Sequence, residues 1–454
     1  MLNFTLSEVA LWTRGRRIGA DDAMVRGVAT DSRRLQTGDL FVALKGEHQD
    51  GHDHVAGAAS AGAAAALVSR QLDVDLPQVV VDDTLVALGD LASAVRARRQ
   101  ARVIGITGSN GKTTVKTLTA AILSRHGRTH VNAGNFNNEI GMPLTLLDMP
   151  EDTEYAVLEM GAGKPGDIAY LAAIARPQVG LVNNVASAHL ERMGSLQGIA
   201  ETKGAMYETL PADGTAIINA DSDFAAFFTG LAGSRDILRF GLDASADVQA
   251  GIESMDAEGS RFRLSTPHGD MPVQLPLPGR HNVANALAAT AIACALDVPL
   301  DTIVAGLEHV DPVAGRLAAR HMSGDWTLID DSYNANPGSA AAAIDTLLLT
   351  PGEHWLVLGD MGELGPDARK LHADLGELAR TRGVERLFTV GGLARAAAEQ
   401  FGADASHFDD QAALTRALTE AVHPGVVCLV KGSRASKMDQ VVATLTGEGA
   451  DHAA

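Results

Sequence analysis

The sequence has few of the features that mark secreted, disulfide-bonded or membrane-spanning proteins. Only 2 of its 454 residues are cysteine. Because there is no CxxC motif and no metal-ligand spacing, Cys294 and Cys428 are predicted to be small core residues. No apolar run approaches the roughly 18 residues that indicate a membrane-spanning helix. The first residues lack the basic start and apolar core of a signal peptide, so we expect the protein to be cytoplasmic.

Basic residues are scarce relative to acidic ones. The chain has 37 Lys and Arg against 56 Asp and Glu, a formal net charge of −19. This balance disfavours nonspecific attraction to nucleic acid or insertion into an anionic membrane surface, so any phosphate must be held by a local site. Apolar residues at 46% and charged residues at 20% indicate a globular chain. At about 150 residues per domain, the length predicts about three domains.

Alternating apolar runs and helical patterns predict an α/β protein with three domains. Residues 1–84 combine short extended runs with an alanine-rich stretch at 56–66, expected to be helical, and predict a small N-terminal α/β domain. Residues 85–310 predict a central, doubly wound, mostly parallel sheet with helices on both faces. Residues 311–454 repeat the alternation and predict a C-terminal Rossmann-like α/β domain.

The clearest motif is the glycine-rich segment GITGSNGKTT at 105–114, between a predicted strand and a predicted helix. In a P-loop, backbone N–H groups surround phosphate oxygens, the lysine reaches the outer phosphates and the hydroxyl can ligate Mg²⁺. The strict pattern has glycine where this chain has Ile106, yet two glycines still bracket the turn. The motif predicts a triphosphate site made by Gly108, Ser109, Asn110, Gly111, Lys112, Thr113 and Thr114.

Two polar residues fall at predicted strand ends near this motif. Glu159 ends the apolar run 156–159, and His189 follows the run 179–185. In an open parallel sheet, ligands gather at the carboxyl ends of the strands. Either residue alone is as well explained by a capping or loop role. Together with the P-loop they predict ligands of a divalent cation.

Lys203 departs from the helical pattern around it. In the predicted helix 195–210 it falls on the buried stripe formed by Leu196, Ile199, Ala200, Met206, Tyr207 and Leu210. A lysine directed inward normally snorkels to solvent or pairs with a carboxylate. Near a metal and a triphosphate its ammonium would repel the cation, whereas carbamylation by CO₂ would make it an anionic metal ligand. The residues alone permit both interpretations.

Four residues further along the chain complete the candidate site. His281 and Asn282 open an alanine-rich helix and could contact a base or cap that helix. Arg316 and Asp331 lie in the third predicted domain. They suit charge neutralisation at the γ-phosphate and recognition of a ribose hydroxyl, with solvated surface roles as the alternative.

Together these motifs resemble the Mur ligases, ATP-dependent amide-forming enzymes of bacterial cell-wall precursor synthesis, over essentially the full length. The P-loop TGSNGKT at 107–113 has the family's form, which accounts for Ile106. Segments similar to the family's uridine-nucleotide domain are DSR at 31–33, GDLFVALKG at 38–46 and DGH at 50–52. Segments similar to its D-alanyl-D-alanine-adding branch are NFNNEIG at 135–141, PLTLL at 143–147, DDSYNANP at 330–337 and LGDMGELG at 358–365.

The resemblance implies ligands for each predicted domain. The expected partners are UDP-N-acetylmuramoyl-tripeptide for residues 1–84, ATP for residues 85–310 and D-alanyl-D-alanine for residues 311–454.

 

The resemblance also implies ATP and Mg²⁺ as cofactors, with two ions expected, and a carbamate derived from CO₂ on Lys203. It places Lys112 and Thr113 on ATP and Mg²⁺, and Thr113, Glu159, His189 and Lys203 on metal. It also places Asn282 near adenine with His281 beside it, Arg316 on phosphate and Asp331 on ribose. Catalysis is expected to depend on Lys112, Lys203, His189 and Arg316. Substrate contacts are expected from Asp31, Ser32, Arg33, Asn137, Asn138, Tyr333, Asn334 and Asn336.

The implied reaction runs through an acyl phosphate, formed when a substrate carboxylate attacks the γ-phosphorus of ATP and consumed when an amine attacks in turn. Alternatives remain: another Mur-type or folate-type amide ligase, a kinase-like phosphotransferase, or a non-catalytic nucleotide-binding partner. The uridine-like segment speaks against the folate branch, and the absence of an Asp-Asn-Pro-Arg motif speaks against the diaminopimelate-adding one. Because three covalently joined domains build the whole site, we expect a monomer.

Overall fold

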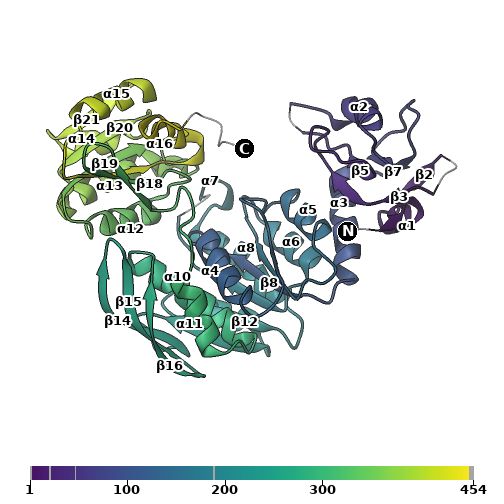
Figure 1. Cartoon of the computed structure of the whole chain (residues 1–454), viewed down its shortest axis with the longest axis horizontal. Coiled ribbons are helices and arrows are strands. Elements are labelled where there is room, and N and C mark those ends of the chain that lie inside the picture. Colours follow the sequence, from purple (N-terminus) through teal and green to yellow (C-terminus); the bar gives the residue numbers. More distant parts are fainter. Residues whose placement is uncertain (1–2, 20–21, 47, 188–189, 449–454) are drawn as a thin grey trace.

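The computed structural model describes residues 3–19, 22–46, 48–187 and 190–448. Three large β-sheets follow one another along the chain, and each carries helices (Figure 1). The sheet of the central part lies below the other two in Figure 1, so the chain forms two outer lobes above a central one. This arrangement agrees with the predicted α/β class.

The first sheet has five strands in the order β2-β7-β6-β5-β4, and a short pair, β1 and β3, lies beside it. Within the described part of the five-stranded sheet, β2 runs antiparallel to β7 and the other strands pair in parallel, while β1 and β3 pair antiparallel. The elements of this part are β1 (Phe4–Thr5), α1 (Leu6–Trp12), β2 (Arg16–Ile18), β3 (Met24–Val25), β4 (Gly27–Ala29), β5 (Asp39–Val42), the 3₁₀ turn Gly51–His54, α2 (Val55–Ser60), β6 (Ala65–Val68), β7 (Gln78–Val80) and α3 (Thr84–Ala97).

The helix predicted at 56–66 is wrong in its second half. Helix α2 ends at Ser60, and Ala65 and Ala66 begin strand β6. Gly62 between them has a φ of +94°, a left-handed conformation that suits glycine and stops a helix. Since both alanines are fully buried between neighbouring strands, tertiary packing overrides the helical preference of the alanine run.

The central sheet has nine strands in the order β16-β15-β14-β13-β12-β11-β8-β10-β9. The strands from β9 to β14 pair in parallel, as predicted, whereas β14, β15 and β16 form antiparallel hairpins that the sequence analysis did not predict. Its strands are β8 (Arg102–Thr107), β9 (Thr129–Val131), β10 (Tyr155–Glu159), β11 (Val179–Val182), β12 (Thr215–Asn219), β13 (Asp236–Gly241), β14 (Val248–Asp256), β15 (Gly259–Thr266) and β16 (Gly269–Leu275).

Helices cover both faces of this sheet, as a doubly wound fold requires. Residues from α4 (Lys112–Leu123), α10 (Arg280–Ala295) and α11 (Leu300–Glu308) share one buried cluster. Those from α5 (Gly141–Leu147), α6 (Asp167–Ala175), α8 (Leu196–Glu208) and α9 (Ala225–Ala232) share the other, and α7 (Leu190–Met193) packs beside α8. One expected core residue is exposed: Leu196 opens α8 and keeps 43% of its surface accessible.

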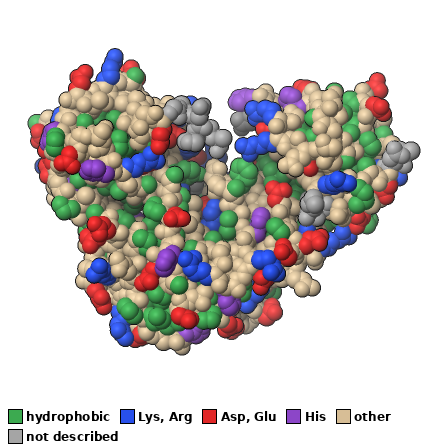
Figure 2. Space-filling model, in the orientation of Figure 1, with side chains coloured by type: hydrophobic (Ala, Val, Ile, Leu, Met, Phe, Trp, Pro, Cys, Tyr) green, Lys and Arg blue, Asp and Glu red, His purple; other side chains and the backbone are tan. Residues whose placement is uncertain are grey.

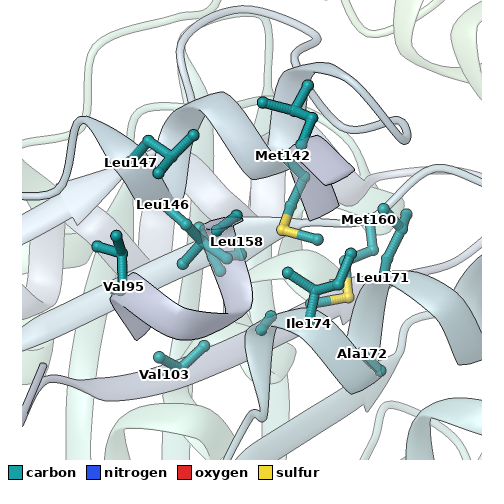
Figure 3. Packing of buried hydrophobic residues seen from close by; sticks show 14 of the residues in the cluster. Val95, Val103, Met142, Leu146, Leu147, Leu158, Met160, Leu171, Ala172 and Ile174 are labelled. Atoms are coloured by element: carbon teal, nitrogen blue, oxygen red, sulfur yellow. The ribbon is translucent and has the colours of Figure 1, made fainter. Parts of the chain in front are cut away.

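The cluster on the second face also continues into the first sheet. Helix α3 contributes Leu88, Leu91 and Val95, which pack between the inner face of the five-stranded sheet and helices α5 and α6. Figure 3 shows part of this cluster, in which Val95 of α3 appears with Val103 of β8, Leu146 of α5 and Leu158 of β10. A single apolar core therefore spans the first and the central sheets.

The third sheet has six strands in the order β17-β18-β22-β19-β20-β21, all parallel except β17, as expected for a Rossmann-like unit. Helices α12 to α14 share a buried cluster on one face, and α15 and α16 share one on the other. The elements are β17 (Ala318–Met322), β18 (Trp326–Asp331), α12 (Pro337–Leu347), β19 (Glu353–Gly359), the 3₁₀ turn Gly365–Asp367, α13 (Ala368–Arg382), β20 (Arg386–Val390), α14 (Arg395–Phe401), β21 (Ala405–Phe408), α15 (Gln411–Ala421), β22 (Val426–Lys431), the 3₁₀ turn Arg434–Ser436 and α16 (Asp439–Thr446).

The prediction for the two cysteines is confirmed. Cys294 and Cys428 are both buried and unpaired. Burial raises the pKa of Cys294 to about 11 and that of Cys428 to about 12, so both are inert thiols at neutral pH. Within the described ranges, no helix combines the length and the apolar character that crossing a membrane requires.

Candidate active site

The glycine-rich motif forms a tight turn between β8 and the start of α4. Gly111 has a φ of +77°, and a Cβ atom there would lie 2.4 Å from Oδ1 of Asn285. Only glycine fits this position without strain. The ammonium of Lys112 folds back over the turn and donates to the carbonyl oxygens of Gly108 at 2.9 Å and Ser109 at 3.4 Å. The turn has the shape of a phosphate-binding P-loop.

Asparagine side chains of the neighbouring strand end hold the P-loop in place, and no sequence motif predicted them. Asn184 accepts a hydrogen bond from the backbone N–H of Asn110 at 2.8 Å. Asn183 donates to the carbonyl of Asn110 and to Oδ1 of Asn285, both at 3.0 Å. Asn183 and Asn184 follow β11 directly, at the same carboxyl edge as Glu159, and this placement was the available signal.

Glu159, at the end of β10, is buried and hydrogen-bonded through both carboxylate oxygens. Oε2 accepts from the hydroxyl of Thr113 at 2.9 Å, and Oε1 accepts from Nδ2 of Asn137 at 2.7 Å. Nζ of Lys116 lies 3.6 Å from Oε2. The predicted pair of Thr113 and Glu159 is therefore brought together beside the P-loop.

This pair fits a magnesium ion by its chemistry. A hydroxyl and a carboxylate oxygen beside a P-loop are the hard oxygen donors that Mg²⁺ takes together with substrate phosphates. Thr113 and Glu159 are the residues that could hold it. His189, the third predicted ligand, lies outside the described residues.

Lys203 is buried in α8 with only 2% of its surface exposed, which confirms the inward placement read from the helical pattern. Among the residues that the structure describes, no carboxylate lies within ion-pair distance of its ammonium. Burial, with a smaller contribution from the charge of Lys112, lowers the pKa of Lys203 to about 7. Burial of this amine without a counter-charge favours its neutral form.

Residues of the third sheet face the P-loop across a cavity. The Arg316 guanidinium stacks over the Tyr333 ring at 4.2 Å. Nδ2 of Asn336 donates to Oδ1 of Asn110 at 2.6 Å. Arg316, Tyr333, Asn334 and Asn336 all line the cavity with the P-loop and Glu159. Predicted site residues of the central part and of the C-terminal part therefore line the same cavity.

The same cavity is lined by predicted and unpredicted residues of the central part. Asn137 and Asn138 lie on its wall as expected, and Glu139, Lys164 and Arg192 join them. Figure 2 shows the surface hollowed between the two outer lobes, with acidic and basic side chains interspersed over this face. The cavity lining thus mixes basic side chains, Lys112, Lys164, Arg192 and Arg316, with the acidic Glu139, Glu159 and Asp167.

Asn282 and Thr114 line a second, smaller cavity that Arg316 also borders. His281 is partly buried nearby, and burial, reinforced by the charge of Lys431, lowers its pKa to about 4. The imidazole is therefore neutral at physiological pH. Thr114, Thr117 and Leu118 belong to α4, so this cavity lies along the helix that begins at the P-loop.

Two predicted groups lie away from the main cavity. Asp331 is buried at the end of β18 and forms an ion pair with Lys431, a partner that the sequence analysis did not foresee. Asp31, Ser32 and Arg33 form the turn after β4, where Nη2 of Arg33 lies 2.7 Å from Oδ2 of Asp31. That turn belongs to the carboxyl edge of the first sheet.

A P-loop at the carboxyl edge of a mostly parallel sheet, facing polar side chains of a separate α/β sheet, defines a nucleotide-dependent enzyme built from several α/β units. The chain belongs to the Mur ligase family. Residues 24–106 match the model described as Mur ligase family, catalytic domain, residues 106–293 the Mur ligase middle domain, and residues 315–434 the Mur ligase, glutamate ligase domain. The resemblance drawn from its motifs is thus confirmed, and the chain is an ATP-dependent amide ligase.

Relatives with this architecture match the chain from end to end. The UDP-N-acetylmuramoyl-tripeptide–D-alanyl-D-alanine ligase of Escherichia coli is 46% identical over 99% of this chain and 100% of its own length. A crystal structure of MurF from Acinetobacter baumannii superposes with a TM-score of 0.93 at 36% identity, over 98% of this chain and 99% of that one. MurF ligase from Thermotoga maritima, solved with ADP, has a TM-score of 0.84 at 28% identity, over 94% and 99%.

Proposed function

We propose that this chain joins D-alanyl-D-alanine to UDP-N-acetylmuramoyl-tripeptide, with ATP converted to ADP and phosphate, in peptidoglycan precursor synthesis. The observation that carries the proposal is the shared cavity. The P-loop lines it together with Asn137 and Asn138 of the NFNN segment at 135–138 and residues 334–336 of the NANP segment at 334–337. Those last two segments are the ones that resemble the dipeptide-adding branch, and full-length relatives carry the name of that reaction.

We also propose how the ligands divide among the predicted domains. Residues 1–84 would hold the uridine nucleotide at the carboxyl edge of the first sheet, near Asp31, Ser32 and Arg33. Residues 85–310 would hold ATP, and residues 311–454 would bring the dipeptide. Because one chain supplies all the proposed site residues, we propose a monomer that acts in the cytoplasm.

In the proposed reaction, the terminal carboxylate of the peptide attacks the γ-phosphorus of ATP and the bond to the ADP oxygen breaks. The amine of the dipeptide then attacks the acyl carbon, loses a proton and displaces phosphate. Lys112 and Arg316 are placed to balance phosphate charge, which is the main demand of phosphoryl transfer. Asn137 and Asn336 would orient the reactants from opposite walls of the cavity.

Bound Mg²⁺ would supply positive charge that polarises the transferring phosphoryl group. Thr113 and Glu159 would hold one ion, and His189 with a carbamylated Lys203 would hold the other. The uncompensated burial of Lys203 and its lowered pKa support carbamylation. Asn282 would lie near adenine and His281 beside it.

The deciding assay measures phosphate release with the UDP-tripeptide, ATP and D-alanyl-D-alanine. Release that needs all three supports the ligase. Equal phosphate release without the dipeptide would contradict the ligase proposal and favour a phosphotransferase. No release under any combination would favour a non-catalytic nucleotide-binding protein. Lys112→Ala serves as the control for contaminating ATPase activity.

A further inference from the structure

A second buried lysine, Lys116, lies on α4 one turn beyond Lys112. Its surface is 5% exposed. Its ammonium donates to the carbonyl oxygens of Asn132 and Gly134, both at 2.9 Å, and lies 3.6 Å from Oε2 of Glu159. Three acceptors thus match the three donors of one ammonium. Nothing in the function proposed above uses this residue.

The two carbonyl groups belong to the segment 132–140 between β9 and α5. Residues 133–136 of this segment are exposed, so apolar burial contributes little to its position. Asn132 is 1% exposed, and its side chain bonds the backbone N–H and carbonyl of Glu159, both at 3.0 Å. Polar clamps therefore hold the segment to the end of β10.

The same segment carries Asn137 and Asn138 into the main cavity. Asn137 donates to Glu159, and its carbonyl accepts from the N–H of Gly161 at 2.8 Å. Lys116 is the clamp that ties this segment to α4, the helix that begins at the P-loop. Its position links the P-loop end of the cavity to the wall that carries Asn137 and Asn138.

We propose that Lys116 is a positioning residue that sets the segment 132–139 for binding the peptide substrate and keeps Glu159 turned toward Thr113. The inference rests on the proposed function for the identity of that substrate. The structural part of the proposal can be tested without turnover. Removing the buried ammonium leaves two carbonyl groups without their hydrogen-bond donor whether or not the protein is catalysing a reaction.

The test compares Lys116→Met, which removes the charge and the donors, with Lys116→Arg, which keeps both. Lys370→Met, at an exposed lysine of α13, is the matched control. In Lys116→Met we expect at least a tenfold rise in KM for the UDP-tripeptide, a smaller change in kcat, and faster amide exchange in residues 132–139. ADP affinity should stay within about threefold, and Lys116→Arg should recover part of the KM.

An unchanged KM together with unchanged exchange in Lys116→Met would overturn the proposal. So would equal losses of ADP affinity and peptide affinity, since these would indicate general disruption of the fold. If Lys116→Met does not fold, Lys116→Gln is measured by the same criteria, because it retains an amide donor. The exchange and ADP measurements need no turnover, so they separate failure of this inference from failure of the ligase assay in the wild-type protein.

Discussion

Asn336 and Asn110 are separated by 226 residues and joined by one hydrogen bond of 2.6 Å. Asn110 lies in the P-loop, and Asn336 is the N-cap of α12, where its side chain accepts from the N–H of Ser339. One amide thus caps a helix of the third sheet through its oxygen and contacts the nucleotide loop through its nitrogen. This contact links the position of α12 to that of the P-loop.

The effects of replacing the two asparagines on kcat/KM are expected to be non-additive. In a double-mutant cycle of Asn110→Ala and Asn336→Ala, the hydrogen bond should contribute about 0.5–1.5 kcal/mol to kcat/KM for the dipeptide. Asn336→Ala also loses its cap, at about 1 kcal/mol of stability. Ser339→Ala disturbs the same capping box without touching Asn110 and isolates that effect. Strictly additive effects on kcat/KM would show that Asn110 and Asn336 are not energetically coupled.

Gly111→Ala is expected to destabilise the protein by about 2 kcal/mol or more, because a left-handed conformation and a close contact with Asn285 both oppose a Cβ atom. ADP affinity should fall at least tenfold. Gly230→Ala in α9 is the matched control, since a Cβ there meets no atom within 4 Å. That change should raise stability by about 0.5–1 kcal/mol. Thermal unfolding and calorimetric ADP titration measure both, and equal behaviour of the two variants would contradict the argument.

Lys203→Ala should lower kcat by about 10²-fold or more, the scale expected when a preorganised charge is lost at the reaction centre. Short carboxylic acids such as acetate should restore part of the activity, because they can replace the missing carbamate. Lys370→Ala is the control: its kcat should equal that of the wild-type protein, and acetate should not change it. A fully active Lys203→Ala enzyme would refute the carbamate proposal.

The pH dependence of the free energy of unfolding should reflect protonation of the His281 imidazole. Its pKa is about 4 in the folded protein against an ordinary 6.5, so the unfolded chain binds more protons between these values. The folded state is therefore progressively destabilised as pH falls from about 6.5 to about 4. Relative to His281→Gln, the wild-type protein should lose on the order of 2 kcal/mol over this range. His268→Gln, at an exposed turn, is the control, and parallel curves for wild type and His281→Gln would count against a partly buried, neutral ring.

Local patterns were sufficient to predict the P-loop, the inward placement of Lys203 and the parallel sheets. Each depends on residues close together in sequence, such as the strand, turn and helix around 105–114, or the three- and four-residue spacing around Lys203. Glu159 was found because a strand end specifies a sheet edge before the strand order is known.

Long-range partners could not be predicted in this way. The ion pair of Asp331 with Lys431 depends on β18 and β22 being neighbours. The packing that makes Ala65 and Ala66 a strand depends on β5 and β7 in the same manner. Both depend on strand order, which the pattern of apolar residues leaves undetermined.

The core shared through α3 has a mechanical consequence. The first and central sheets are joined by apolar packing, whereas the third sheet keeps its own clusters and meets the central part at polar contacts such as Asn336 with Asn110. Rotation of the third sheet breaks few contacts, while separating the first sheet would open a continuous core. Motion during turnover should therefore concentrate near residues 311–317, with the first two sheets moving as one body.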